Sequence, residues 1–315
     1  MSKCFNINNL YKSITMMSSW GKIVLVLIIF LFFSYVLMHA NRENLVEGFT
    51  QREKFISKEG VDLYDSFYSS IYDELVYDNI KNNYELGELV KTTKMNPKQS
   101  MVLDVGSGTG HHVHKLTEMG FNAQGIDVSK EMINKSKSNY PKLAFKQADA
   151  LDTMIFNPES FTHINCLYFT IYYIKNKMSF FENCFKWLKP GGYLNIHLVN
   201  RDNFNPIINA ADPLVLVSPQ KFAKNRITNS IVKFNNFQYK ADFKFLPEKN
   251  LSYFEETFKD DKSGNVRKNN HVFYMDTQKE ILALAKSCGF ILESKIDMVY
   301  CKYEYQYVYI LYKPE

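Results

Sequence analysis

Glycines and acidic residues recur where short apolar segments end in the middle of the chain. Asp104 comes just before Gly106, and Gly108 and Gly110 follow at alternate positions. A glycine-rich turn after a strand lets backbone N–H groups approach a ligand, because no Cβ atom stands in the way. Asp127 follows Gly106 by about 20 residues, where doubly wound folds place an acid against ribose hydroxyls. These residues predict a site for a nucleotide-like ligand.

The spacing of the glycines restricts the choice of ligand. A dinucleotide fingerprint reads Gly-x-Gly-x-x-Gly, but the sixth position counted from Gly106 is His111. Asp104 inside the strand and the turn Lys189-Pro190-Gly191-Gly192 also differ from the dinucleotide pattern. A dinucleotide is therefore the weaker of the two interpretations.

Alternating strands and helices must position these residues. The expected strands are 101–105, 122–128, 143–147, 161–169 and 193–199, and the expected helices are 111–119, 130–138 and 178–188. Gly120 is in the position of a helix stop and Ser129 in that of a helix cap. Repeated strand–helix units with short connections predict an α/β fold with a doubly wound, mostly parallel sheet.

Residues 201–275 interrupt this alternation. Their apolar patterns predict an antiparallel β meander inserted into the fold, with strands at 231–245, 251–258 and 265–275. Thr277 then caps a helix, and 290–300 and 303–313 are close enough to form an antiparallel hairpin. The hairpin brings the predicted sheet to seven strands.

The amino-terminal part differs in composition from the rest. Residues 23–38 are apolar and no charged residue lies between Lys22 and Arg42. A helix that crosses a bilayer needs about 20 apolar residues, so we expect a retained transmembrane anchor at 23–40. A cleaved signal peptide is the alternative, although Met38-His39-Ala40 is a poor cleavage site.

The flanking segments follow from that anchor. Residues 1–22 are an amino-terminal polar segment and 41–60 a linker, and an amphipathic helical pattern runs over 61–94. Free thiols favour a catalytic domain that faces the cytoplasm.

Charge and cysteine usage exclude several classes. The net charge of +5 is too mild to indicate nucleic-acid binding by itself. The five cysteines form no Cys-x-x-Cys pair, which signals neither a disulfide framework nor a zinc site. His111, His112 and His114 have no acidic or thiol partner nearby in the sequence, so no metal is predicted.

Five segments in this order resemble class I S-adenosylmethionine-dependent methyltransferases: 102–110, 125–129, 147–150, 161–173 and 188–192. The resemblance covers 61–200 and 276–315, which we assign to the methyltransferase domain, and implies S-adenosyl-L-methionine as cofactor. It also implies that Asp104 accepts from the cosubstrate ammonium, Asp127 from the ribose hydroxyls and Asp149 from the adenine amino group. The implied cofactor-binding residues are Tyr72, Asp104, Gly106, Ser107, Gly108, Gly110, His111, Asp127, Val128, Asp149 and Ala150.

The methyl acceptor is less well defined. Methyl transfer needs mainly alignment, and a base only where the acceptor is protonated. Tyr168, Tyr172 and His271 are the candidate catalytic residues, and the insertion at 201–275 is expected to cover the acceptor. Arg201, Arg226, Tyr253 and Arg267 are further candidates for its recognition.

A small-molecule or lipid acceptor is favoured, because the absence of an Asn/Asp-Pro-Pro-aromatic sequence removes the signature for DNA amines and glutamine. Two alternatives remain open: a catalytically degenerate membrane scaffold, and an RNA- or cap-directed enzyme.

Overall fold

The computed structural model describes residues 17–40, 53–211, 220 and 223–315. The chain divides into two compact units, Met1–Glu47 and Gly48–Glu315. In the first unit, helix α2 spans Ser19–Ala40.

The predicted membrane anchor at 23–40 is not supported. Within the described residues, no helix is both long enough and apolar enough to cross a membrane. The side chains of α2 are described only as far as Ser34, so the remainder of the predicted anchor lies outside them. A cytoplasmic location stays a prediction.

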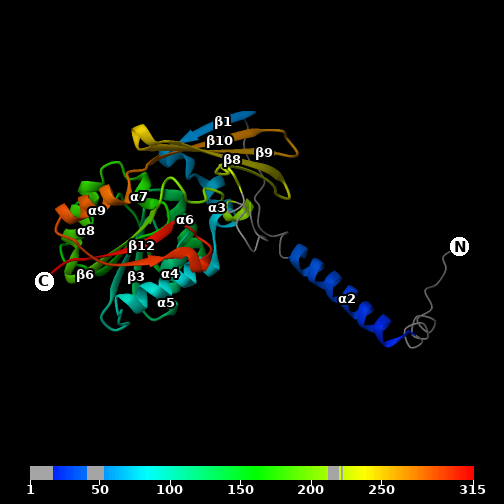
Figure 1. The fold of residues 1–315 in the computed structure, drawn as a ribbon, viewed down its shortest axis with the longest axis horizontal. Coiled ribbons are helices and arrows are strands. Elements are labelled where there is room, and N and C mark those ends of the chain that lie inside the picture. Colours follow the sequence, from blue (N-terminus) through cyan, green and yellow to red (C-terminus); the bar gives the residue numbers. More distant parts are fainter. Residues whose placement is uncertain (1–16, 41–52, 212–219, 221–222) are drawn as a thin grey trace. The chain divides into compact units, whose positions relative to one another are not determined.

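The second unit contains the predicted seven-stranded sheet, in the order β11-β12-β6-β5-β2-β3-β4 (Figure 1). Strands β2 to β6 run parallel, whereas β12 is antiparallel to both β6 and β11, which confirms the carboxyl-terminal hairpin. The strands are β2 Met101–Val105, β3 Asn122–Asp127, β4 Ala144–Gln147, β5 Phe161–Cys166, β6 Leu188–Val199, β11 Ile291–Asp297 and β12 Gln306–Tyr312.

Helices flank this sheet. They are α3 Ser66–Val76, α4 Asn79–Thr92, α5 His111–Glu118, α6 Lys130–Asn139, α7 Thr170–Tyr173, α8 Lys177–Trp187 and α9 Gln278–Ser287. The predicted caps are confirmed: the Ser129 hydroxyl accepts from the Met132 N–H, and Thr277 forms a reciprocal capping box with Glu280. The helical pattern at 61–94 is two helices instead of one, because Asp78 accepts from two N–H groups and starts α4.

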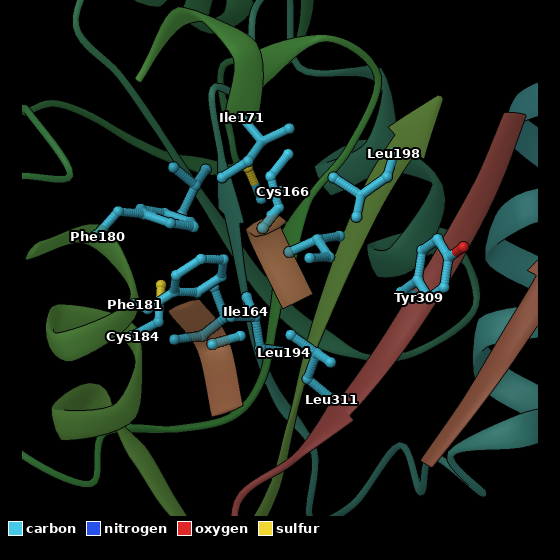
Figure 2. Packing of buried hydrophobic residues seen from close by; sticks show 14 of the residues in the cluster. Ile164, Cys166, Ile171, Phe180, Phe181, Cys184, Leu194, Leu198, Tyr309 and Leu311 are labelled. Atoms are coloured by element: carbon cyan, nitrogen blue, oxygen red, sulfur yellow. The ribbon is translucent and has the colours of Figure 1, made fainter. Parts of the chain in front are cut away.

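The main core lies where the middle strands meet α8 and α9. Figure 2 shows Ile164 and Cys166 of β5 beside Leu194 of β6, with Phe180 and Phe181 of α8 packed against them. All five side chains are fully buried. This apolar layer fixes the strands whose carboxyl ends carry the predicted site.

A second sheet, in the order β1-β10-β9-β8-β7, is built mainly from the insertion. Its strands are β1 Phe55–Glu59, β7 Asn229–Lys233, β8 Phe237–Leu246, β9 Leu251–Asp260 and β10 Val266–Tyr274. Two expectations were wrong here. The expected strand 231–245 turns back at 234–236 and pairs with itself as β7 and β8. The expected linker 41–60 contains β1, which pairs in parallel with β10.

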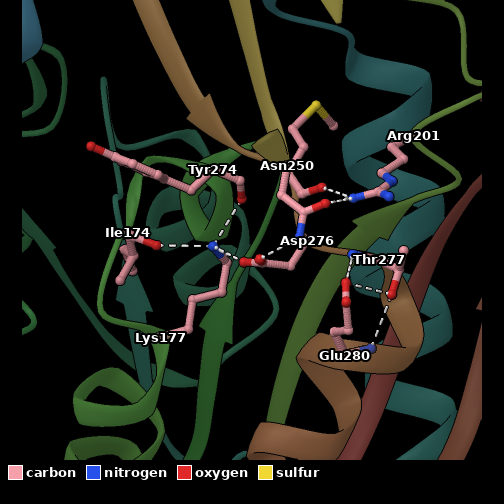
Figure 3. Close-up of polar contacts among 9 residues, drawn as sticks. Ile174, Lys177, Arg201, Asn250, Tyr274, Asp276, Thr277 and Glu280 are labelled. Atoms are coloured by element: carbon pink, nitrogen blue, oxygen red, sulfur yellow. Dashed lines mark hydrogen bonds and ion pairs between the residues drawn. The ribbon is translucent and has the colours of Figure 1, made fainter. Parts of the chain in front are cut away.

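Polar contacts tie the two ends of the insertion to each other and to the main domain (Figure 3). Near its start, the Arg201 guanidinium donates to Asn250 Oδ1 and to the Met275 carbonyl, both at 2.6 Å. At its end, buried Lys177 Nζ lies 2.9 Å from Asp276 Oδ2 and donates to the Tyr274 carbonyl at 2.8 Å. The second sheet is therefore held at both of its connections.

Candidate active site

A cavity of about 650 Å³ is bounded by the carboxyl ends of β2 and β3, by α3 and by the second sheet. Parallel strands of a doubly wound sheet present ligands at this end. Its volume is in the range of small-molecule sites in proteins, about 300–1,000 Å³. One end is formed by the glycine turn and acidic residues, and we call it the acidic end. The other end is formed mainly by rings, and we call it the aromatic end.

The glycine turn gives the acidic end its backbone surface. Gly106 has a φ of +70°, and a Cβ there would lie 2.6 Å from the Thr170 side chain. Gly110 has a φ of +94°, and a Cβ would lie 2.7 Å from the Phe145 ring. Side chains are excluded at both positions, for conformational and steric reasons.

Asp104 supplies a buried carboxylate at this turn. Its side chain is 3% exposed, and its Oδ2 makes no hydrogen bond within the described residues. The Nδ1 atom of His112 lies 3.8 Å from that oxygen. Burial raises the pKa of Asp104 to about 6. A buried acceptor without a donor is costly, so the site fits a ligand that brings a cationic donor.

Asp127 ends β3 beside the same turn. Its two oxygens accept from the Gly108 N–H at 3.0 Å and from the Ser129 N–H at 2.8 Å. Burial raises its pKa, and the two N–H groups oppose that rise. The second lone pair of each oxygen stays available, which is the arrangement that two vicinal hydroxyls require.

Helix α3 is tied to the turn through Asp73. One oxygen of this carboxylate accepts from the Thr109 hydroxyl at 2.6 Å, and the other lies 3.0 Å from His111 Nε2. The Tyr77 ring stacks on His111 at 4.0 Å. These contacts hold Tyr72, which lines the cavity, over Gly108.

A buried ionic cluster lies behind Asp104. Glu85 accepts from Lys81 Nζ at 2.8 Å and lies 2.7 Å from His112 Nε2. Burial alone would raise the pKa of Glu85, but Lys81 and His112 lower it to about 2. Lys81 is therefore held in an ion pair with Glu85, and its Nζ also lies 5.1 Å from the ring centroid of Tyr168.

Three hydrogen bonds connect four side chains at the aromatic end. The Tyr64 and Tyr173 hydroxyls are 2.7 Å apart, and the Tyr173 hydroxyl is 2.6 Å from His271 Nδ1. On the other side of the ring, His271 Nε2 is 2.8 Å from Glu256 Oε2. Burial raises the pKa of Tyr64 and of Tyr173 well above the usual range, so both hydroxyls stay protonated.

The surroundings of Glu256 indicate which group donates in each of these hydrogen bonds. Its buried carboxylate also accepts from the Tyr239 hydroxyl at 2.8 Å and from Asn269 Nδ2 at 3.3 Å. Neighbours that donate fit the ionised, acceptor-only form of a carboxylate. In the tautomer of His271 that donates from Nε2 to Glu256, Nδ1 accepts from the Tyr173 hydroxyl, and Tyr64 donates to Tyr173.

The arginines considered for acceptor recognition serve the scaffold instead. Arg267 NH1 pairs with Asp65 at 2.8 Å and NH2 donates to the Leu63 carbonyl, which joins β10 to the start of α3. Arg226 donates to the carbonyls of Phe204 and Arg201. Tyr253 is exposed. None of these side chains lines the cavity.

Most predicted site residues meet in this cavity. The lining includes Tyr72, Asp104, Gly106, Ser107, Gly108, His111, Asp127, Val128, Asp149, Ala150, Tyr168 and His271. Two predicted residues lie outside it. Gly110 packs behind the turn against Phe145, and the Tyr172 hydroxyl accepts from the Val199 N–H at 2.8 Å inside the core.

Glu256 was not predicted as a site residue from the sequence, although the alternation of side chains along its strand indicates that it is buried. Side chains alternate along a strand, and Phe254 and Phe258 mark the inward face of β9. Glu256 lies between them on the same face, as an acid flanked by two aromatic residues. The partnership of Tyr64 with Tyr173 had no such signal, because 109 residues separate them.

Comparisons with known proteins agree with this geometry. A family model described as a methyltransferase domain matches residues 96–249. A ubiquinone biosynthesis O-methyltransferase of Aliivibrio fischeri is 28% identical over 32% of this chain and 44% of its own length. A phosphoethanolamine N-methyltransferase of Plasmodium falciparum is 30% identical over 31% of this chain and 39% of its own.

A solved structure extends the likeness to the whole fold. An S-adenosylmethionine-dependent methyltransferase from Clostridium acetobutylicum superposes with a TM-score of 0.59 at 17% identity, covering 79% of this chain and 98% of its own. The chain matches about half or less of the length of the curated relatives. With the family match, these findings identify a domain of the class I S-adenosylmethionine-dependent methyltransferases.

Proposed function

We propose that the protein transfers the methyl group of S-adenosylmethionine to a small molecule bound at the aromatic end of the cavity. The observation that carries this proposal is the unpaired, buried Oδ2 of Asp104 in the same cavity as the His271–Glu256 pair. Asp104 would accept from the cosubstrate ammonium, and Asp127 would accept from the ribose hydroxyls. The curated relatives are named a ubiquinone biosynthesis O-methyltransferase and a phosphoethanolamine N-methyltransferase, and these names support a small-molecule acceptor.

The acidic end would hold the cosubstrate, and the aromatic end would hold and align the acceptor. S-adenosylmethionine supplies an electrophilic methyl group on a sulfonium that is already a good leaving group. The protein therefore has to align the acceptor and exclude water, which the rings of Tyr68, Phe254 and Phe273 do at the aromatic end. An acceptor that carries a proton must also lose it, and His271 is the base for that proton through Tyr173.

Two measurements on the full chain test this function. Isothermal titration with S-adenosylmethionine and its demethylated product, S-adenosylhomocysteine, should give saturable binding at a single site. Tritium transfer from labelled cosubstrate to a panel of small molecules should then identify an acceptor. Absence of cosubstrate binding by a folded protein would contradict the proposal, and binding without transfer would favour the degenerate scaffold.

A further inference from the structure

We propose that the acceptor is an amine, which binds at the aromatic end beside Tyr64 and passes its proton through Tyr173 to His271. This inference rests on the proposed function and adds the chemical class of its substrate. Three observations on the described residues carry it: the direction of the hydrogen-bond chain when His271 accepts on Nδ1, the lack of a lysine or arginine in contact with Glu256, and the pairing of Lys81 and of the nearby arginines with other groups.

The hydrogen-bond chain requires a donor in the cavity. Because Tyr64 donates to Tyr173, its own oxygen presents only lone pairs to a ligand. Tyr64 lines the cavity, so the group that meets it must bring an N–H or O–H. Carboxylates, and phosphates in their fully ionised form, offer no such donor.

Glu256 favours a donor that is positively charged. Its partners are Tyr239, Asn269 and His271, and none of them is a lysine or arginine. An ionised carboxylate with 1% exposure is costly unless a positive charge balances it. An ammonium beside the chain, or the proton that it gives to His271, supplies that charge.

Aromatic rings surround the place where the ammonium would lie. The ring centroids of Tyr64 and Tyr68 are 5.5 Å apart, and Tyr68 lies 5.9 Å from the His271 ring. The Phe254 ring also lies near His271, with ring centroids 5.5 Å apart. The faces of such rings attract cations.

Most cationic side chains around the cavity, among the described residues, already have partners that compete with an anionic acceptor. Arg201, Arg226 and Arg267 are held by backbone carbonyls and Asp65, away from the cavity. Of the two lysines that line the cavity, Lys81 is paired with Glu85. The other, Lys175, lies 5.9 Å from the ring of Tyr274.

The reaction balances with these groups alone and the cosubstrate. The ammonium N–H bond breaks as its proton moves to Tyr64, while the Tyr64 proton moves to Tyr173 and the Tyr173 proton to His271 Nδ1. The freed electron pair of the nitrogen forms the N–CH₃ bond as the S–CH₃ bond breaks, and that electron pair stays on sulfur. The products are an N-methylammonium ion, a neutral thioether and an imidazolium paired with Glu256, so the two positive charges of the reactants are both accounted for.

Three probes of one shape and different charge test this inference. 2-Phenylethylamine, 2-phenylethanol and phenylacetate are titrated into the full chain by calorimetry, with and without S-adenosylhomocysteine. We expect the amine to bind at least tenfold more tightly than the alcohol, and phenylacetate to bind most weakly. An amine that binds no better than the alcohol, or does not bind, overturns the inference.

Two variants on one strand separate charge from structure. Glu256→Gln should abolish the preference for the amine and leave the affinities for the alcohol and for S-adenosylhomocysteine unchanged. Glu255→Gln is the matched control, because Glu255 is exposed and paired with Lys268. Equal weakening of all probes by Glu256→Gln in a folded protein would assign Glu256 a structural role and overturn the inference. Failure of S-adenosylhomocysteine to bind would instead contradict the proposed function.

Discussion

The two ends of the cavity are built in different ways. The acidic end comes from the carboxyl ends of adjacent parallel strands, where Asp104 and Asp127 lie beside one glycine turn. The aromatic end is assembled from segments far apart in the chain: 98 residues separate Tyr173 from His271, and 202 separate Asp65 from Arg267.

The two ends also differ in whether they lie in the region that matches the family model. The acidic end lies inside the region 96–249 that matches the family model, whereas His271 and Tyr64 lie outside it. Under the proposed function, cosubstrate binding would use the part of the chain that matches the family model. Acceptor recognition would use contacts between segments far apart in the chain, so the two ends are expected to be separable by mutation.

The largest expected effect is on the rate of transfer at the aromatic end. In His271→Asn, no ring nitrogen can take the acceptor proton, and we expect methyl transfer to fall by about 10²–10⁴-fold. Cosubstrate affinity should stay within about twofold of the wild-type value, because His271 lies at the other end of the cavity. Steady-state kinetics and calorimetry give both values; an unchanged rate would remove His271 from the mechanism.

The next largest effect is on affinity at the acidic end. Asp127→Ala removes a charged acceptor and should weaken S-adenosylmethionine binding by about 3 kcal/mol, on the order of 100-fold. Tyr253→Phe, an exposed change in the second sheet, serves as the control in the same calorimetric titration. Undiminished affinity in Asp127→Ala would place the ribose elsewhere.

The features that could be predicted from the sequence depend on residues close together in the chain. The strands, their order of appearance and the caps at Ser129 and Thr277 follow from residues a few positions apart. The glycine turn and its acids lie together because parallel strands end at one edge of the sheet. The acidic end was therefore predicted almost completely, apart from Gly110, whose neighbour Phe145 belongs to a different strand.

Tertiary contacts account for the features that could not be predicted in this way. No sequence pattern near β1 predicts that it pairs with β10, so residues 55–59 were assigned to a linker. Tyr172 and Tyr173 are adjacent in α7, and only the packing of that short helix turns one hydroxyl into the core and the other towards His271. Residue type alone cannot distinguish such neighbours.

A smaller effect is expected from the pH dependence of cosubstrate binding. Burial raises the pKa of Asp104 to about 6 in the free protein, and a bound ammonium stabilises the ionised form. Affinity should therefore be full above about pH 6 and fall as the pH decreases below it, by up to about tenfold per unit. Asp104→Asn should bind weakly with a flat profile between about pH 5 and pH 7. A flat profile in the wild-type protein would contradict this role.

The smallest effect on activity is expected from Tyr172→Phe, and its neighbour provides the contrast. Loss of the Tyr172 hydroxyl leaves the buried Val199 N–H without this acceptor and should cost about 1–3 kcal/mol of folding free energy. The rate of transfer should stay within about twofold of wild type, because Tyr172 lies outside the cavity. Tyr173→Phe should instead lower the rate, since it interrupts the path from Tyr64 to His271. Thermal melts give the stability of each variant, and steady-state kinetics give its rate of methyl transfer. A rate that falls in Tyr172→Phe but not in Tyr173→Phe would contradict the roles assigned to the two hydroxyls.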